Sequence, residues 1–258
     1  MVELVSAVTS SVASVDILGV RVDAVTYRDT LDIIASWIEQ REPHQIATAN
    51  PEFVMAAQAD AAFREVLRAS DLCVPDGAGL LWAARRLGRH LPERVTGSDL
   101  VPLVAQAAAQ HGWRLFLLGA APGVALQTGH VLEQRNPGLR IVDAYAGSPS
   151  EADAQAIVRR VQAAAPDVLF VAYGAPAQDL WIARHKQNLA VPVMMGVGGA
   201  FDHIVGVQRR APGWVQRIHL EWLFRLVTQP WRWRRQLALP RFVWAVLRQD
   251  RASGQATS

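Results

Sequence analysis

Short apolar runs alternate with longer amphipathic stretches along most of this chain, and that alternation most constrains its fold. The strand-like runs lie at 17–25, 45–50, 72–75, 114–118, 141–145, 168–173 and 193–197. Helical spacing of apolar residues separates them, as at 26–40, where Thr26 is placed to cap the helix. Parallel strands need such crossovers, so the pattern predicts a Rossmann-like α/β fold with a mostly parallel sheet and helices on both faces. The first run carries a central glycine, which indicates a β-hairpin or bulge.

The basic charge is concentrated at the C-terminal end. Residues 209–251 hold ten arginines against two acidic residues, whereas the rest of the chain holds sixteen basic and twenty-one acidic side chains. Five of the nine tryptophans also lie there. The change in composition predicts a flexible N-terminus at 1–15, a Rossmann-like domain at 16–208, a helical, basic, Trp-rich appendage at 209–250 and a disordered tail at 251–258.

Several classes of protein are excluded by residues that the chain lacks. Cys73 is the only cysteine, which excludes a disulfide framework and cysteine-based metal sites. The first basic residue is Arg21, and no apolar run approaches the roughly 18 residues of a membrane span, so we expect a cytoplasmic chain without a signal peptide. Lys186 is the only lysine, so there is no Walker motif. The histidines show no metal-ligand spacing, and we expect no metal.

Polar residues and glycines follow the predicted strands, at the edge where open α/β sheets bind ligands. Asp76 follows the third run, together with Gly77 and Gly79. Glycines at this edge let the backbone approach a ligand closely. The candidate substrate-binding residues are Thr48, Asn50, Gly119, Gly174, Gln178, Gly198 and Asp202.

Each of these residues also has a simpler structural interpretation. Asp76 before Gly77 is typical of a turn or a helix cap, and Asn50 before Pro51 is typical of a turn. The loop 119–123 resembles a phosphate-binding turn at a helix N-terminus, but it lacks the spacing of a dinucleotide fingerprint, so an NAD-dependent enzyme is not expected. The acidic residues at 151 and 153 follow a serine-rich helix start rather than forming a metal motif.

The basic C-terminal segment allows three interpretations. Its apolar residues recur at helical spacing, which fits a terminal helix packed on the body with solvated arginines. Interleaved arginines and tryptophans at 231–235 also fit stacking on a nucleic acid, or an interfacial surface for anionic lipid. Arginine suits phosphate in either setting. Composition alone does not separate lipid phosphate from nucleic-acid phosphate.

Seven motifs in one order resemble the WecG/TagA/CpsF family of bacterial glycosyltransferases over residues 17–245. They are Thr48-Ala49-Asn50-Pro51-Glu52, Pro75-Asp76-Gly77-Ala78-Gly79, Arg94-Val95-Thr96-Gly97-Ser98-Asp99-Leu100, Gly174-Ala175-Pro176-Ala177-Gln178-Asp179, Gly196-Val197-Gly198-Gly199-Ala200-Phe201-Asp202, Arg209-Arg210-Ala211-Pro212 and Glu221-Trp222-Leu223-Phe224-Arg225-Leu226. Each motif alone is weak evidence for the family, but all seven motifs in this order are specific to it. One departure is Asp179, where the family usually has glutamate.

The resemblance implies transfer of a sugar, with inversion, from a UDP-sugar to undecaprenyl-diphosphate-linked GlcNAc. N-acetylmannosamine for teichoic acid is the leading donor sugar, and UDP-ManNAcA or UDP-glucose for capsule or exopolysaccharide are alternatives. It implies no metal, no cofactor and no nucleic acid, but a peripheral place on an anionic membrane at the inner face of the plasma membrane. Self-association into a homo-oligomer is a further expectation. A non-catalytic nucleotide or nucleic-acid binding module is the alternative class.

The resemblance also assigns roles to individual residues. Asp76 matches the catalytic base, which takes the proton of the acceptor hydroxyl. Arg94 matches a site arginine, which stabilises charge on the departing diphosphate. Thr48, Asn50 and Gln178 match polar contacts, and Asp202 is the candidate for uridine. In the appendage, the residues that match the family's contacts to the lipid diphosphate are Arg225, Arg232 and Arg235.

Overall fold

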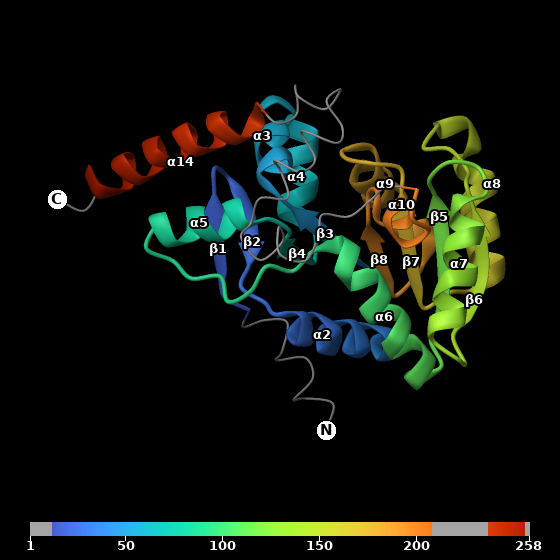
Figure 1. Ribbon diagram of the computed structural model, residues 1–258. Coiled ribbons are helices and arrows are strands. Elements are labelled where there is room, and N and C mark those ends of the chain that lie inside the picture. Colours follow the sequence, from blue (N-terminus) through green and yellow to red (C-terminus); the bar gives the residue numbers. More distant parts are fainter. Residues whose placement is uncertain (1–11, 208–236, 256–258) are drawn as a thin grey trace.

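A six-stranded sheet forms the centre of the molecule, and all its strands run parallel (Figure 1). The computed structural model describes residues 12–207 and 237–255, without the side chains of 251–255. The strand order is β4-β3-β8-β7-β5-β6. The strands are β3 (His44–Ala49), β4 (Leu72–Pro75), β5 (Arg114–Gly119), β6 (Arg140–Tyr145), β7 (Val168–Ala172) and β8 (Val193–Gly196). The predicted Rossmann-like sheet is therefore confirmed.

Helices cover both faces of this sheet. Alternate strand residues point to opposite faces, so Ile46 and Phe170 pack into one core, whereas Ala47 and Leu169 face the other side. The first face carries α2 (Tyr27–Gln40), α6 (Gly97–His111), α7 (Val124–Arg135) and α10 (Ala200–Ile204). The second carries α3 (Pro51–Ala59), α4 (Ala61–Ala69), α8 (Glu151–Ala164) and α9 (Ala177–Leu189).

Polar side chains fix where several helices begin. Thr26 and Asp29 form a capping box at α2, as the sequence predicts for Thr26. The α6 helix is capped by Thr96, whose side chain accepts the Asp99 amide. Ser150 caps α8, so Glu151 and Asp153 lie in its first turn, where they complement the helix dipole.

A second layer packs beside β4, at the side of the molecule away from β6 (Figure 1). It contains the antiparallel hairpin β1 (Ser14–Ile17) and β2 (Val20–Asp23), with α5 (Ala78–Arg86) and α14 (Ala238–Gln255). Phe242 and Val246 of α14 are fully buried in this core. Gln249 binds the backbone of the hairpin, accepting from the Leu18 amide at 2.9 Å.

The terminal helix partly matches the predicted appendage. Its apolar side packs on the body, as expected for a terminal helix, and Arg86 pairs with Asp250 at 2.8 Å. The helix continues to Gln255, five residues into the stretch 251–258 for which the sequence predicted a tail. No helix within 12–207 or 237–255 is long and apolar enough to cross a membrane.

Chain direction diverges at the carboxyl ends of β3 and β8. These strands are neighbours, but β3 leads into α3 on one face, whereas β8 leads into α10 on the other. In open α/β sheets ligands bind beyond such a switch point. This edge of the sheet is therefore the place to look for a site.

Candidate active site

Asp76 lies directly after β4, at the N-terminus of α6. Its backbone amide donates to the Ala49 carbonyl at 2.6 Å, which fixes it beside the end of β3. Its Oδ2 accepts the Gly97 amide at 3.1 Å, and Gly97 is the first residue of α6. A helix N-terminus stabilises negative charge. Asp76 is thus a half-buried side chain held at the ligand edge of the sheet.

Thr48 connects Asp76 to the β8 loop. A side chain on Gly97 would lie 3.3 Å from Thr48 Cγ2, so Thr48 contacts the same helix start that holds Asp76. Its hydroxyl donates to the Gly196 carbonyl at 3.4 Å. Thr48 is 5% exposed, so it contributes mainly to the floor of the site.

Asn50 caps α3, and its Oδ1 accepts the Phe53 amide at 3.0 Å. The turn interpretation of Asn50-Pro51 is therefore correct in part, since that oxygen is engaged and the side-chain NH2 is the end that suits a ligand. The β4–α5 loop lies tight against this turn. A Cβ at Gly77 would be 3.0 Å from Pro51, and one at Gly79 would be 2.6 Å from it. Glycine is needed for this close approach.

Gln178 holds the loop after β8. It is 1% exposed, and its Oε1 accepts the Gly198 amide at 2.9 Å. Its own backbone amide donates to the carbonyl of Gly174, which has a φ of +77°. Gly174, Gln178 and Gly198 therefore meet, as predicted. The buried Gln178 side chain therefore positions the loop after β8 through its contact with the Gly198 amide.

Asp202 and Arg94 come from the segments that follow β8 and precede α6. Asp202 is half-buried in the first turn of α10, which follows the β8 loop. Arg94 is half-buried in the segment before α6, where the next residue, Val95, donates to the Pro75 carbonyl at 2.9 Å. Arg94 is thus fixed close along the backbone to Asp76.

Gly119 is separated from the group around Asp76. It ends β5, three strands from β3, which at about 4.8 Å per strand is roughly 14 Å away. Its φ is +105°, and a Cβ there would lie 2.7 Å from the Ala172 carbonyl carbon. The structure therefore gives Gly119 a packing role between β5 and β7. The lipid-diphosphate candidates Arg225, Arg232 and Arg235 lie outside the described residues.

Two further residues support the site and were missed as candidates. Tyr27 accepts the Thr96 amide at 2.9 Å and donates to Asp99 at 3.1 Å, so it braces the α6 start that holds Asp76. Burial raises the pKa of Tyr27 to about 12, so the phenol stays protonated and keeps donating at neutral pH. Asp179 is fully buried, and burial raises its pKa to about 7. No local motif marks Tyr27, because its partners are about 70 residues away.

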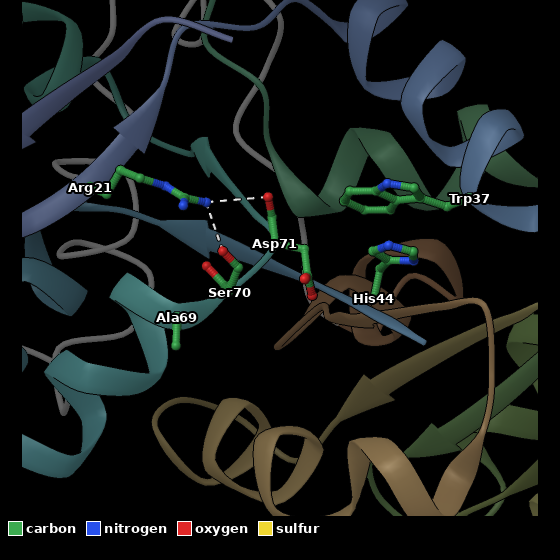
Figure 2. A pocket seen from close by; sticks show the side chains of 6 residues that line it. All are labelled: Arg21, Trp37, His44, Ala69, Ser70 and Asp71. Atoms are coloured by element: carbon green, nitrogen blue, oxygen red, sulfur yellow. Dashed lines mark hydrogen bonds between the residues drawn. The ribbon is translucent and has the colours of Figure 1, made fainter. Parts of the chain in front are cut away.

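The hollow in Figure 2 lies at the opposite edge of the sheet, at the amino ends of β3 and β4. Its volume is about 300 Å³. The Trp37 and His44 rings stack at 4.2 Å, and Arg21 donates to the carbonyls of Ser70 and Asp71. These polar groups are engaged with one another, and none follows the carboxyl end of a strand. The candidate active site is therefore the edge with Asp76.

The acidic, histidine and cysteine side chains of the described ranges form no group of three that could hold a metal ion. Metal-independent chemistry remains a prediction.

Comparison with known proteins adds to this geometry. Residues 15–256 match the glycosyl transferase WecG/TagA/CpsF family. Several relatives carry the name N-acetylglucosaminyldiphosphoundecaprenol N-acetyl-beta-D-mannosaminyltransferase. The protein of that name from Bacillus spizizenii is 35% identical over 220 residues, 85% of each chain. The one from Bacillus subtilis strain 168 is 32% identical over 83% of each chain, and one from Staphylococcus aureus strain MRSA252 is 31% identical over 94% of this chain and 95% of its own.

Proposed function

The chain belongs to the WecG/TagA/CpsF family of glycosyl transferases, and we propose that it transfers N-acetylmannosamine from a UDP-sugar to undecaprenyl-diphosphate-linked GlcNAc. The acceptor and the sugar are those in the names of its relatives. The observation that carries the proposal is the meeting of Thr48, Asn50 and Asp76 with the β8 loop at one edge of the sheet.

The proposed reaction is one in-line displacement at the sugar C1. The acceptor hydroxyl oxygen forms a bond to C1 as the bond from C1 to the UDP β-phosphate oxygen breaks, so the configuration inverts. Asp76 takes the hydroxyl proton, and UDP leaves with the bonding electron pair. The backbone at Arg94 is held beside Pro75 and Asp76, and a guanidinium from this position would suit the charge that develops on the diphosphate. No step in this scheme needs a metal.

The donor sugar is tested by offering UDP-ManNAc, UDP-ManNAcA and UDP-glucose with a synthetic polyprenyl-diphosphate-GlcNAc, in EDTA. We expect product with UDP-ManNAc and no loss of rate in EDTA. Product only with another UDP-sugar would show that N-acetylmannosamine is not the sugar transferred, but it would leave the proposed displacement at C1 unchanged. UDP binding without any product would favour the non-catalytic alternative, and activity restored by a divalent cation would contradict the metal-free mechanism.

The outer side of α14 supports a peripheral place on the inner face of the plasma membrane. Trp244 is 56% exposed there, next to the exposed Arg241 and Val243, and the Arg248 guanidinium lies 3.4 Å from the centre of its ring. Exposed Trp82 lies on α5, which packs against α14. Tryptophan and arginine together suit the headgroup region of an anionic bilayer. On its inner side, Phe242 lies beside the first turn of α5, where a Cβ on Gly79 would be 3.7 Å from its ring. A lipid-linked acceptor would thus be delivered close to the base.

Removing Arg241 and Arg248, two of the three arginines of α14, is expected to weaken binding to vesicles that contain phosphatidylglycerol. Each arginine near an anionic surface contributes about 1 kcal/mol, so Arg241→Ala with Arg248→Ala should lower the partition coefficient roughly 20- to 30-fold in low salt, as measured by vesicle sedimentation. The matched control removes two exposed cations elsewhere, Arg28 and Arg159. If both double variants lose the same vesicle affinity, then net charge, and not the outer side of α14, governs binding.

A further inference from the structure

Asp179 is a buried acid with no partner of ordinary geometry. Its side chain is fully buried, and neither oxygen accepts a hydrogen bond of ordinary geometry within the described ranges, although the Gln178 side-chain amide and the residue's own backbone amide lie near enough to lower its pKa in part. A buried carboxylate without hydrogen bonds is costly, and few are kept without a function. The residue lies in the first turn of α9, directly after Gln178. Gln45 fixes its backbone by donating to the Asp179 carbonyl at 3.1 Å.

The carboxyl and the Gln178 amide converge on one bare position of β8. A Cβ on Gly196 would lie 2.6 Å from Gln178 Nε2 and 2.9 Å from Asp179 Oδ1. Only glycine leaves room for both groups at this strand position. The Gln178 amide therefore lies near the same strand position as Asp179 Oδ1, and its oxygen contacts the loop at Gly198.

The orientation of the Gln178 amide decides whether the loop is held. Its oxygen must face Gly198 to accept the 2.9 Å hydrogen bond, which leaves its NH2 end on the side of Asp179. An ionised carboxylate only accepts hydrogen bonds, so it favours the NH2 end and hence this orientation. A protonated carboxyl can donate, and it then accommodates the amide oxygen equally well.

We propose that Asp179 is a positioning residue for the sugar-transfer site: its ionised carboxylate orients the Gln178 amide so that the amide oxygen holds Gly198 and the β8 loop beside Thr48. The inference rests on the proposed function for its role in turnover, but the contact with the loop is independent of it.

The ionisation of this carboxyl falls in the physiological range. Burial raises the pKa of Asp179 to about 7, and the nearby Gln178 amide opposes that shift only in part. On the side of β4 the facing group is the buried Cys73 thiol, whose own pKa is raised by burial and by Asp23 and Asp179, and which therefore stays neutral. Arg21 pairs with Asp23 on the far side of Cys73, so no described cation contacts Asp179. The fraction of Asp179 that is ionised, and that can orient the Gln178 amide, therefore declines as the pH falls through about 7.

The test compares the wild-type protein with Asp179→Asn, whose side chain has nearly the same shape but does not titrate. Between pH 8 and pH 6, we expect kcat/KM for the donor to fall several-fold in the wild type and then level off, because the protonated carboxyl no longer favours the amide orientation that holds Gly198. The fall should be absent in the variant. The matched control is Asp167→Asn, which alters another buried carboxylate at the opposite edge of the sheet, where Asp167 pairs with Arg41 and Arg114. That control should keep the wild-type profile.

A second measurement does not depend on turnover. Hydrogen exchange of the peptide that covers 196–201, corrected for the intrinsic effect of pH, should speed up in the wild type at pH 6 relative to pH 8. It should be insensitive to pH in Asp179→Asn. The same pH dependence in both proteins would overturn the inference. Absent transfer in the wild type at pH 8 would count against the proposed function alone, and the exchange result would still decide the role of Asp179.

Discussion

Asp76→Asn is expected to lower the rate of sugar transfer by about 10²- to 10⁴-fold, the usual contribution of a positioned general base. The amide cannot take the proton of the acceptor hydroxyl. Its Oδ1 can still accept the Gly97 amide that Asp76 Oδ2 accepts at 3.1 Å, so the start of α6 should keep its position. The rate is measured as radiolabelled sugar transferred to the polyprenyl-diphosphate acceptor.

The fold and the donor site of this variant must be checked separately. We expect an unchanged melting temperature within about 2 °C, the shift of a sub-kcal/mol change, and unchanged UDP affinity by calorimetry. Asp32→Asn, at a side chain that is 70% exposed on α2, is the matched control and should retain full activity. Normal turnover by a folded Asp76→Asn protein would contradict the role of Asp76 as base.

Gly119→Ala is expected to destabilise the protein by about 3 kcal/mol or more, because a new methyl group would meet backbone atoms that cannot move aside. Its Cβ would lie 2.7 Å from the Ala172 carbonyl carbon and 2.8 Å from the oxygen, and its φ of +105° lies in the region that glycine alone adopts easily. The loss is measured as the free energy of unfolding in urea.

The variant Gly123→Ala is the control that measures the cost of backbone strain without the steric clash expected in Gly119→Ala. Gly123 has a φ of +84°, but a Cβ there would meet nothing within 4 Å, so its loss should be only about 1–2 kcal/mol. If both variants lose the same stability, close packing between β5 and β7 is not the reason for glycine at 119. If Gly119→Ala instead folds normally and loses only donor affinity, the substrate-binding role predicted from the sequence is right and the packing role is wrong.

Local patterns were sufficient for the elements of the fold. The alternation of apolar and amphipathic runs identified the parallel sheet, since the period of apolar residues follows directly from strand and helix geometry. The cap of α6 was not predicted: Thr96 caps this helix, and its side chain accepts the Asp99 amide.

The site was predicted in its residue types but not in its arrangement. Asp76 and Gln178 follow strands, Thr48 is the second-last residue of β3, and all three lie at the carboxyl edge. Gly119 follows a strand too, yet it serves packing, because the strand order places β5 three strands from β3. Position along the chain does not reveal strand order, so it could not separate these cases.

The sequence by itself determined the α/β class, the ligand edge and the family, because these depend on residue types at short spacing. The tertiary structure decided which candidates meet, and it brought Tyr27 beneath Thr96 and placed Asp179 against the bare Cα of Gly196. The burial that raises the pKa of Asp179 has the same origin. Desolvation and close approach depend on atoms supplied by several strands and helices, and the chain brings those atoms together only when the sheet has formed.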